Sequence, residues 1–171
     1  MIDVEQFRLL VVRPVLLELG LHTTDAEELL LGTAAQESRL TYLQQLGNGP
    51  ALGVYQMEPA THKDIWENYL SYKPELAADV VEFASRRSIE HAERINQIDF
   101  RVHARELVSN LAYATAMCRI HYLRQPGELP AGDDVPAMAH YWKRYYNTPA
   151  GRGTVDEFID HYHQYVKNGG K

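Results

Sequence analysis

Cysteine is almost absent from this chain, since Cys118 is the only one in 171 residues. A single thiol excludes an intrachain disulfide and a metal site built from several thiolates. Excess positive charge is also missing, because 17 lysines and arginines face 23 aspartates and glutamates and leave a net charge of −6. Without a basic surface, the sequence predicts no nucleic-acid partner.

Long apolar runs are lacking as well. Between Met1 and Leu21 the apolar residues are interrupted by charged ones, at Asp3, Glu5, Arg8, Arg13 and Glu18. This segment is therefore predicted to be neither a signal peptide nor a membrane span. We expect the protein to be synthesised in the cytoplasm without a signal peptide, so that any export uses another route.

Apolar residues are nevertheless plentiful, at 45% of the chain. Length and composition predict one domain over residues 1–171, and the spacing of the apolar residues predicts a mainly α fold. Helices are expected over residues 4–19, 24–38, 59–69, 74–87, 105–123, 136–145 and 154–166, and Pro14 is expected to kink the first of them or to split it in two. Residues 88–96 are polar and predict no definite element. At most a short β-hairpin is expected, in the glycine-bearing loop at 47–56.

One acidic residue stands out because of its place on a predicted helix. With Thr24 as the N-cap, Leu30, Thr33, Ala34 and Glu37 share one side of a 3.6-residue repeat. A carboxylate on such an apolar stripe is costly unless it is paired or protonated. The alternative is an ordinary surface glutamate at a helix end. In a nonpolar pocket, Glu37 would have a raised pKa and act as a general acid of the glycosidase type.

Three short motifs occur in a defined order: Gln36-Glu37-Ser38, then Gly53-Val54-Tyr55-Gln56-Met57-Glu58-Pro59-Ala60-Thr61, then Tyr145-Tyr146-Asn147-Thr148-Pro149-Ala150-Gly151. Together they resemble the soluble lytic transglycosylases of the lysozyme-like superfamily. The chain is also similar to uncharacterised phage-encoded lysozyme-like proteins. Departures from the family pattern include Tyr55 in place of a methionine, Val54 in place of a leucine, and a longer spacer before Gly151.

The resemblance implies a lysozyme-like helical fold and a role for each motif. Glu37 would be the single catalytic acid and base, and Tyr146 would hydrogen-bond to it and orient it. Gln56 would hydrogen-bond the glycan near the cleaved bond, and Asn147 would shape the adjoining turn. The predicted substrate-binding residues are Gln56, Tyr55, Asn147 and Ser38.

Most glycosidases need a second carboxylate, and Glu58 and Asp64 are the candidates. Glu58 directly precedes Pro59 at a predicted helix start, where an acid is stabilised as a capping partner. A single-acid mechanism is therefore favoured. After protonating the glycosidic oxygen, Glu37 would remove a proton from the C6 hydroxyl, which gives a 1,6-anhydro product, or from water.

The predicted function is cleavage of the MurNAc–GlcNAc bond of peptidoglycan, as a lytic transglycosylase or a muramidase. The glycan strand is the expected partner, and the protein would act on the cell wall or as a virion component beside phage structural proteins. One alternative is a structural or wall-binding protein of lysozyme-like fold without turnover. Another is a hydrolase of a different amino-sugar polymer such as chitin.

Other polar residues are interpreted more simply, and no cofactor is expected. His161 and His163 point about 200° apart on a helix, which disfavours a shared metal ion. His121 and His140 are interpreted as packing or surface residues. Gly151-Arg152-Gly153 is either a plain turn or an anion-binding segment at a helix start. Tyr141 and Trp142 face different sides of one helix, so at least one is expected in the core.

Overall fold

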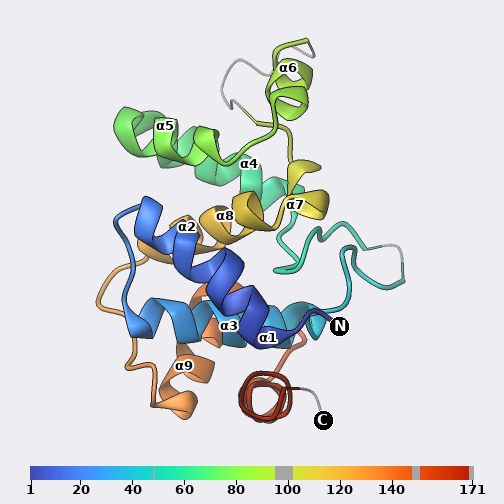
Figure 1. Cartoon of the computed structure of the whole chain (residues 1–171), viewed down its shortest axis with the longest axis vertical. Helices are drawn as coiled ribbons and strands as arrows, with labels where there is room; N and C mark the ends of the chain where they lie inside the picture. Colours follow the sequence, from blue (N-terminus) through green and yellow to red (C-terminus); the bar gives the residue numbers. More distant parts are fainter. Residues whose placement is uncertain (48, 95–101, 148–150, 170–171) are drawn as a thin grey trace.

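The computed structural model describes residues 1–47, 49–94, 102–147 and 151–169, and this part of the chain is mainly helical (Figure 1). The elements in chain order are α1 (Val4–Phe7), η1 (Arg8–Val12), α2 (Arg13–Glu18), α3 (Thr24–Ser38), α4 (Pro59–Asn68), η2 (Leu70–Tyr72), α5 (Pro74–Glu82), α6 (Arg86–Arg94), α7 (Glu106–Ser109), α8 (Leu111–Leu123), α9 (Val135–Trp142), η3 (Lys143–Asn147), α10 (Val155–His161) and η4 (Tyr162–Lys167). The mainly α prediction is confirmed. In place of the possible hairpin, the described residues contain only isolated bridges, from Leu52 to Gln44 and to Met57.

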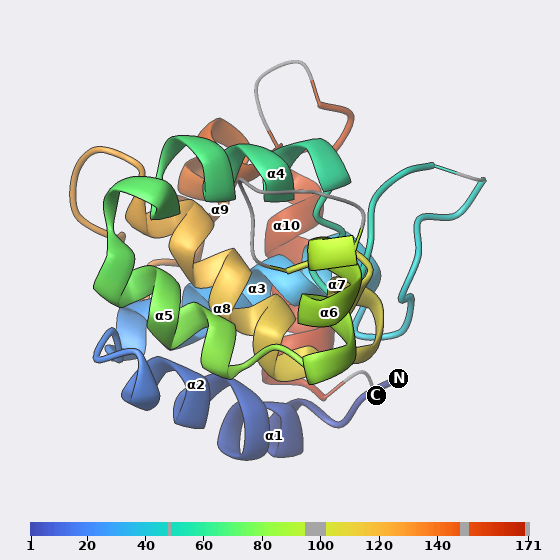
Figure 2. The ribbon, with the colours of Figure 1, turned by 90° about the horizontal axis from the view of Figure 1, so that it is seen from above.

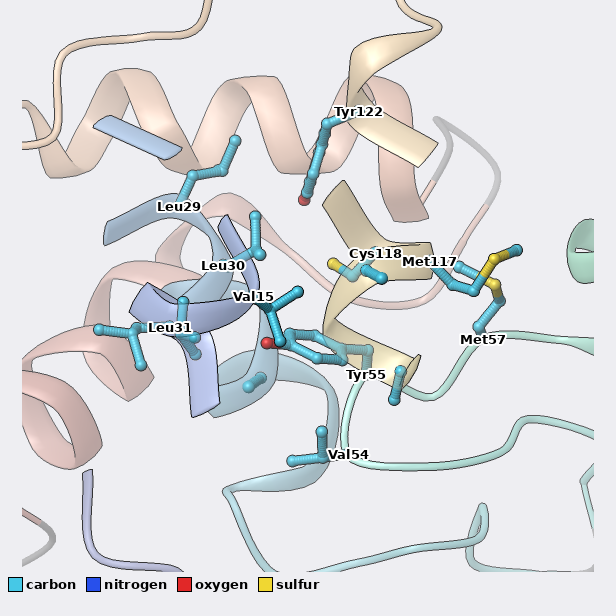
Figure 3. Packing of buried hydrophobic residues seen from close by; sticks show 14 of the residues in the cluster. Val15, Leu29, Leu30, Leu31, Val54, Tyr55, Met57, Met117, Cys118 and Tyr122 are labelled. Carbon is cyan, nitrogen blue, oxygen red and sulfur yellow. The ribbon is translucent and has the colours of Figure 1, made fainter. Parts of the chain in front are cut away.

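Helix α8 runs through the middle of the fold when this is seen from above (Figure 2), and in Figure 1 α4 and α5 lie on one side of it and the N-terminal helices on the other. Every residue from Tyr113 to Tyr122 is buried. Helix α3 crosses it, and the Thr33 Oγ1 and Tyr122 Oη atoms lie 2.8 Å apart in this contact. Figure 3 shows side chains of α2, α3, α8 and residues 54–57 in one apolar cluster. Two long helices therefore bury most of their circumference against the rest of the chain.

The N-terminal helix changes type along its length. Helices α1 and α2 are joined by the π-helical segment Arg8–Val12, and Pro14 falls in the first turn of α2. Proline lacks a backbone N–H and fits best in a first turn, so the wider π turn accommodates it. Gly20, with a φ of +66°, ends α2.

Salt bridges fasten this N-terminal region to α3. Glu27 is 2% exposed and accepts hydrogen bonds from Arg8 at 2.8 Å and from Arg13 at 2.9 Å. Arg8 also donates to Glu28 at 2.7 Å, and Glu28 accepts from the Tyr162 hydroxyl at 2.7 Å. Paired in this way, the carboxylates offset their cost of desolvation.

Several helix limits differ from those expected. Helix α3 spans the expected residues, but its cap is Thr23, whose Oγ1 accepts from the Ala26 N–H at 3.0 Å, and not Thr24. The expected helix at 105–123 is interrupted at Asn110, which adopts an extended conformation. The Asn110 side chain accepts from the Tyr113 N–H and donates to the Phe83 carbonyl, so a capping residue competes with helix continuation. Helix α5 ends at Glu82, earlier than expected, and polar residues 86–94 form α6.

A tight turn at residues 52–57 connects the loop after α3 to α4. The backbones of Leu52 and Met57 exchange two hydrogen bonds of 3.0 Å. Gly53 has a φ of +73°, and a Cβ atom there would overlap the Leu107 carbonyl of α7. Only glycine therefore allows the turn to pack this closely on α7. No helix in the described ranges has the length and apolar character needed to span a membrane.

Candidate functional site

Glu37 lies in the last turn of α3, next to an abrupt change of chain direction. Arg39 and Leu40 follow with φ values of 53° and 52°, in the left-handed region that non-glycine residues rarely adopt. The neighbouring Ser38 side chain turns inward, and its Oγ donates to the Ala34 carbonyl at 3.1 Å. Glu37 therefore stands at the exit of a buried helix, beside the loop that leads to the 52–57 turn.

The Glu37 carboxyl accepts a hydrogen bond from a buried indole. Trp142 Nε1 donates to Glu37 Oε1 at 2.8 Å, and the Trp142 ring, which is fully buried, packs on Phe158 with centroids 5.4 Å apart. Although Glu37 keeps some exposed surface, burial of its carboxyl raises its pKa to about 7, and the Trp142 hydrogen bond only partly opposes this rise. Near neutral pH the group is therefore protonated in a substantial fraction of molecules.

A pocket of about 640 Å³ opens beside this carboxyl. The described residues that line it are Glu37, Gln45, Ala51, Gln56, Met57, Glu58, Thr61, His121, Tyr146, Asn147, Gly151, Arg152 and Gly153. They come from α3, the 45–58 loop, α4, α8, η3 and the segment before α10. The pocket unites four of the six predicted site residues: Glu37, Gln56, Tyr146 and Asn147.

Tyr146 contacts a different group from the one expected. Its hydroxyl donates to the Tyr55 backbone carbonyl at 2.8 Å, whereas the hydrogen bond described for Glu37 comes from Trp142. The prediction that Tyr146 orients Glu37 through its hydroxyl must therefore be corrected. Tyr146 instead connects η3 to the 52–57 turn, and so joins two walls of the pocket. Burial raises its pKa well above the usual value, which keeps the phenol neutral.

Gln56 and Asn147 are both held by local hydrogen bonds. Gln56 has a φ of 46°, and its Nε2 donates to the Gly53 carbonyl at 2.7 Å. The Asn147 Oδ1 accepts from Lys143 Nζ at 2.8 Å, and the same ammonium donates to the Gly151 carbonyl at 2.7 Å. These hydrogen bonds restrict the conformations of both amide side chains in the pocket wall. Such fixed groups favour directional contacts to a polar ligand.

The other two predicted substrate-binding residues, Tyr55 and Ser38, do not line the pocket. Each is 1% exposed. The Tyr55 hydroxyl lies 3.2 Å from Thr115 Oγ1, and its ring packs against Phe7 in the core. The prediction that their side chains bind substrate is wrong, because the fold points both of them into the interior.

His121 is a packing residue, one of the two predicted possibilities, since it is 6% exposed, and it also forms part of the pocket. Its Nε2 lies 3.0 Å from the Tyr145 carbonyl and its Nδ1 lies 3.1 Å from Arg124 Nη2. Its ring meets that of Tyr146 edge-on at 4.9 Å. A guanidinium only donates, so Nδ1 accepts and Nε2 carries the proton. Burial and the nearby Arg124 charge lower the His121 pKa to about 4, which keeps the imidazole neutral. 

The two candidate second carboxylates have different surroundings. Asp64 forms an ion pair with Arg124, outside the described pocket lining. Glu58 occupies the N-cap position of α4, as expected, but its side chain makes no capping hydrogen bond, and it lines the pocket with Glu37. The interpretation of Glu58 as a capping partner is therefore not supported, and Glu58 is the second acidic residue of this pocket.

Metal ligands do not gather in the part of the chain that the structure describes, where no three His, Cys, Asp or Glu side chains form a metal-binding group. His161 instead places its Nδ1 2.7 Å from the Gln36 Oε1. The described lining of the pocket therefore offers a partly protonated acid, three amides and a phenol for polar contacts, a set that can support acid catalysis on a polar substrate.

Comparison with known proteins gives no match. No family model, no curated protein and no solved structure is significantly similar to this chain. The lysozyme-like resemblance stays a prediction from the three short motifs.

Sequence reasoning missed the roles of Trp142 and His121. Tryptophan on an amphipathic helix normally indicates a core position, and Trp142 is indeed buried, but its N–H also needs a partner. Nothing in the local pattern identifies that partner as Glu37, from which it is separated by 105 positions.

Proposed function

We propose that this protein is a glycosidase that cleaves the MurNAc–GlcNAc bond of peptidoglycan with Glu37 as its only catalytic acid. The observation that carries the proposal is the carboxyl of Glu37, which has a pKa raised to about 7 and lines a pocket of about 640 Å³. Such a group is poised to donate a proton at neutral pH and to take one back. The order of the three motifs supports the same substrate class.

In the proposed reaction Glu37 protonates the glycosidic oxygen as the C1–O bond breaks. The N-acetyl carbonyl oxygen of the substrate then forms a bond to C1 and balances its positive charge. Glu37, now a carboxylate, removes the proton of the C6 hydroxyl while O6 bonds to C1 and releases the acetamido oxygen. This gives a 1,6-anhydro sugar and returns the proton to Glu37. Attack by water in place of O6 gives a reducing end.

Gln56 and Asn147 supply both donors and acceptors for sugar hydroxyl and acetamido groups. Tyr146 keeps the wall that carries Asn147 in register with the turn that carries Gln56. On this proposal the glycan strand lies across the pocket between η3 and the 45–58 loop, and the protein acts on the wall, alone or within a virion.

Digestion of purified murein sacculi tests the proposal. Soluble muropeptides are expected from the unaltered protein and not from Glu37→Gln, and mass spectrometry separates anhydro from reducing products by the mass of one water. Sacculi that bind the protein but release no fragments would favour a wall-binding protein without turnover. Preferential digestion of chitin oligomers would favour a different amino-sugar polymer.

A further inference from the structure

The segment Gly151-Arg152-Gly153 is held against the pocket at both of its glycines. A Cβ atom on Gly151 would overlap the Asn147 carbonyl, and one on Gly153 would lie 2.6 Å from the Trp142 ring. The Gly151 carbonyl also accepts from Lys143 at 2.7 Å. Arg152 is therefore placed on the pocket wall by its neighbours, next to the indole that donates to Glu37.

Arg152 is the single lysine or arginine among the described residues that line the pocket. It is exposed, and it forms no ion pair with a carboxylate in the described ranges. The other titratable groups of the described lining are Glu37, which is protonated in a substantial fraction of molecules near neutral pH, the neutral His121 and Tyr146, and Glu58. Among the described residues, the Arg152 guanidinium thus has no hydrogen-bond or ion-pair partner and is available to a ligand.

We propose that Arg152 forms a carboxylate-binding subsite of this pocket, which recognises an acidic group carried by the glycan. A guanidinium presents parallel N–H donors that match the two oxygens of a carboxylate. In peptidoglycan that carboxylate belongs to the peptide stems or, where the stem has been removed, to the lactyl ether. Chitin has neither. This inference rests on the proposed function, since it assigns the substrate class of the same pocket.

The subsite also explains how an acidic protein can bind an anionic polymer. With a net charge of −6, the chain as a whole repels an anionic polymer. At 0.1 M salt, however, charges farther away than about 10 Å are largely screened. For a carboxylate seated beside Arg152, this guanidinium therefore outweighs the acidic residues that lie beyond that distance, and among the described lining residues only Glu58 and the ionised fraction of Glu37 oppose it.

Binding without turnover tests the subsite, in a Glu37→Gln background that blocks cleavage. Cosedimentation is measured with intact sacculi, with sacculi whose stems have been removed by an amidase, and with chitin beads. Adding Arg152→Gln should weaken binding to intact sacculi roughly three- to ten-fold at low salt, the scale of a partly exposed charged contact. The difference should shrink at high salt, and chitin binding should not change. Arg152→Lys should restore part of the affinity.

The matched control is Arg86→Gln, which removes the same charge from an exposed ion pair on α6, outside the described pocket lining. It should leave binding to all three materials unchanged. If Arg152→Gln weakens binding only to stem-free glycan, the lactyl carboxylate is the group that Arg152 binds. If it weakens binding only to intact sacculi, that group belongs to the peptide stem. Equal losses on sacculi and chitin, or no loss on either, would overturn the subsite. Failure of the proposed cleavage would appear separately, as an absence of soluble fragments from the unaltered protein.

Discussion

Trp142 donates a hydrogen bond of 2.8 Å to the Glu37 carboxyl, across the contact between α9 and the end of α3. The indole N–H cannot ionise and cannot accept, so it fixes one carboxyl oxygen without supplying a charge. A cation in the same place would hold Glu37 as a carboxylate. The neutral donor instead orients the group and leaves its pKa under the control of burial.

Replacing Glu37 by Gln removes the titrating proton and keeps nearly the same shape. We expect turnover on sacculi to fall roughly 10²- to 10⁴-fold, the usual contribution of general acid catalysis. The midpoint of thermal unfolding should change little, because no cation pairs with Glu37 in the described part of the chain. Unchanged release of muropeptides by this variant would refute the assignment of Glu37.

Glu58→Gln distinguishes one catalytic carboxylate from two, because both residues line the pocket. If Glu37 acts alone, turnover should fall less than about ten-fold, since only the local charge changes. The measurement is the initial rate on sacculi beside Glu37→Gln. A loss as large as that of Glu37→Gln would instead indicate a two-carboxylate mechanism.

Trp142→Phe removes the N–H and keeps an aromatic ring against Phe158. Because this hydrogen bond lowers the pKa of Glu37, its loss should raise that pKa further. The protonated form would then persist to higher pH, and the alkaline limb of kcat/KM should move upward by roughly one pH unit.

The control for Trp142→Phe is Trp66→Phe, since Trp66 Nε1 donates to the Tyr113 hydroxyl at 3.0 Å, outside the described pocket lining. Both variants lose one buried hydrogen bond, but only the first should move the pH profile. An alkaline limb that stays in place in Trp142→Phe would show that Glu37 does not set it.

Glu27 should make the free energy of unfolding depend on pH in the acidic range. Burial alone would raise its pKa, but hydrogen bonds from Arg13, Arg8 and His22 outweigh burial and lower the pKa to about 2. A pKa below that of the unfolded chain stabilises the folded state above about pH 4.5, and the contribution is lost as the pH falls toward 2. Its size is about 2 to 3 kcal/mol at neutral pH.

The pH-dependent contribution of Glu27 can be measured by urea unfolding of Glu27→Gln at pH 7 and at pH 3. The variant should be less stable than the unaltered protein by about 2 to 3 kcal/mol at pH 7, and the gap should narrow at pH 3. Glu5→Gln is the control, because Glu5 pairs with Arg8 from a 65% exposed side chain. Its effect should be below about 1 kcal/mol. An equal gap at both pH values would contradict the pKa assignment.

Local signals in the sequence determined most of the helices. The limits of α3, the start of α4 at Pro59 and the capping box of Thr154 and Glu157 depend on residues within one turn, and all three match the structure. The position of Glu37 on the apolar stripe of α3 follows from the same short-range periodicity. Such features survive in any fold, because they use only neighbouring residues.

Tertiary contacts decided the partners in the pocket. Three features depend on groups far away in the chain. They are the choice of Trp142 over Tyr146 as the donor to Glu37, the inward direction of Tyr55 and the helix break at Asn110. The sequence by itself therefore determined that an acid lies on an apolar helix face near a glycine-bearing loop. Only the packing of α9 against α3 decided what touches that acid, because a hydrogen bond between residues 105 positions apart produces no periodic pattern in the sequence between them.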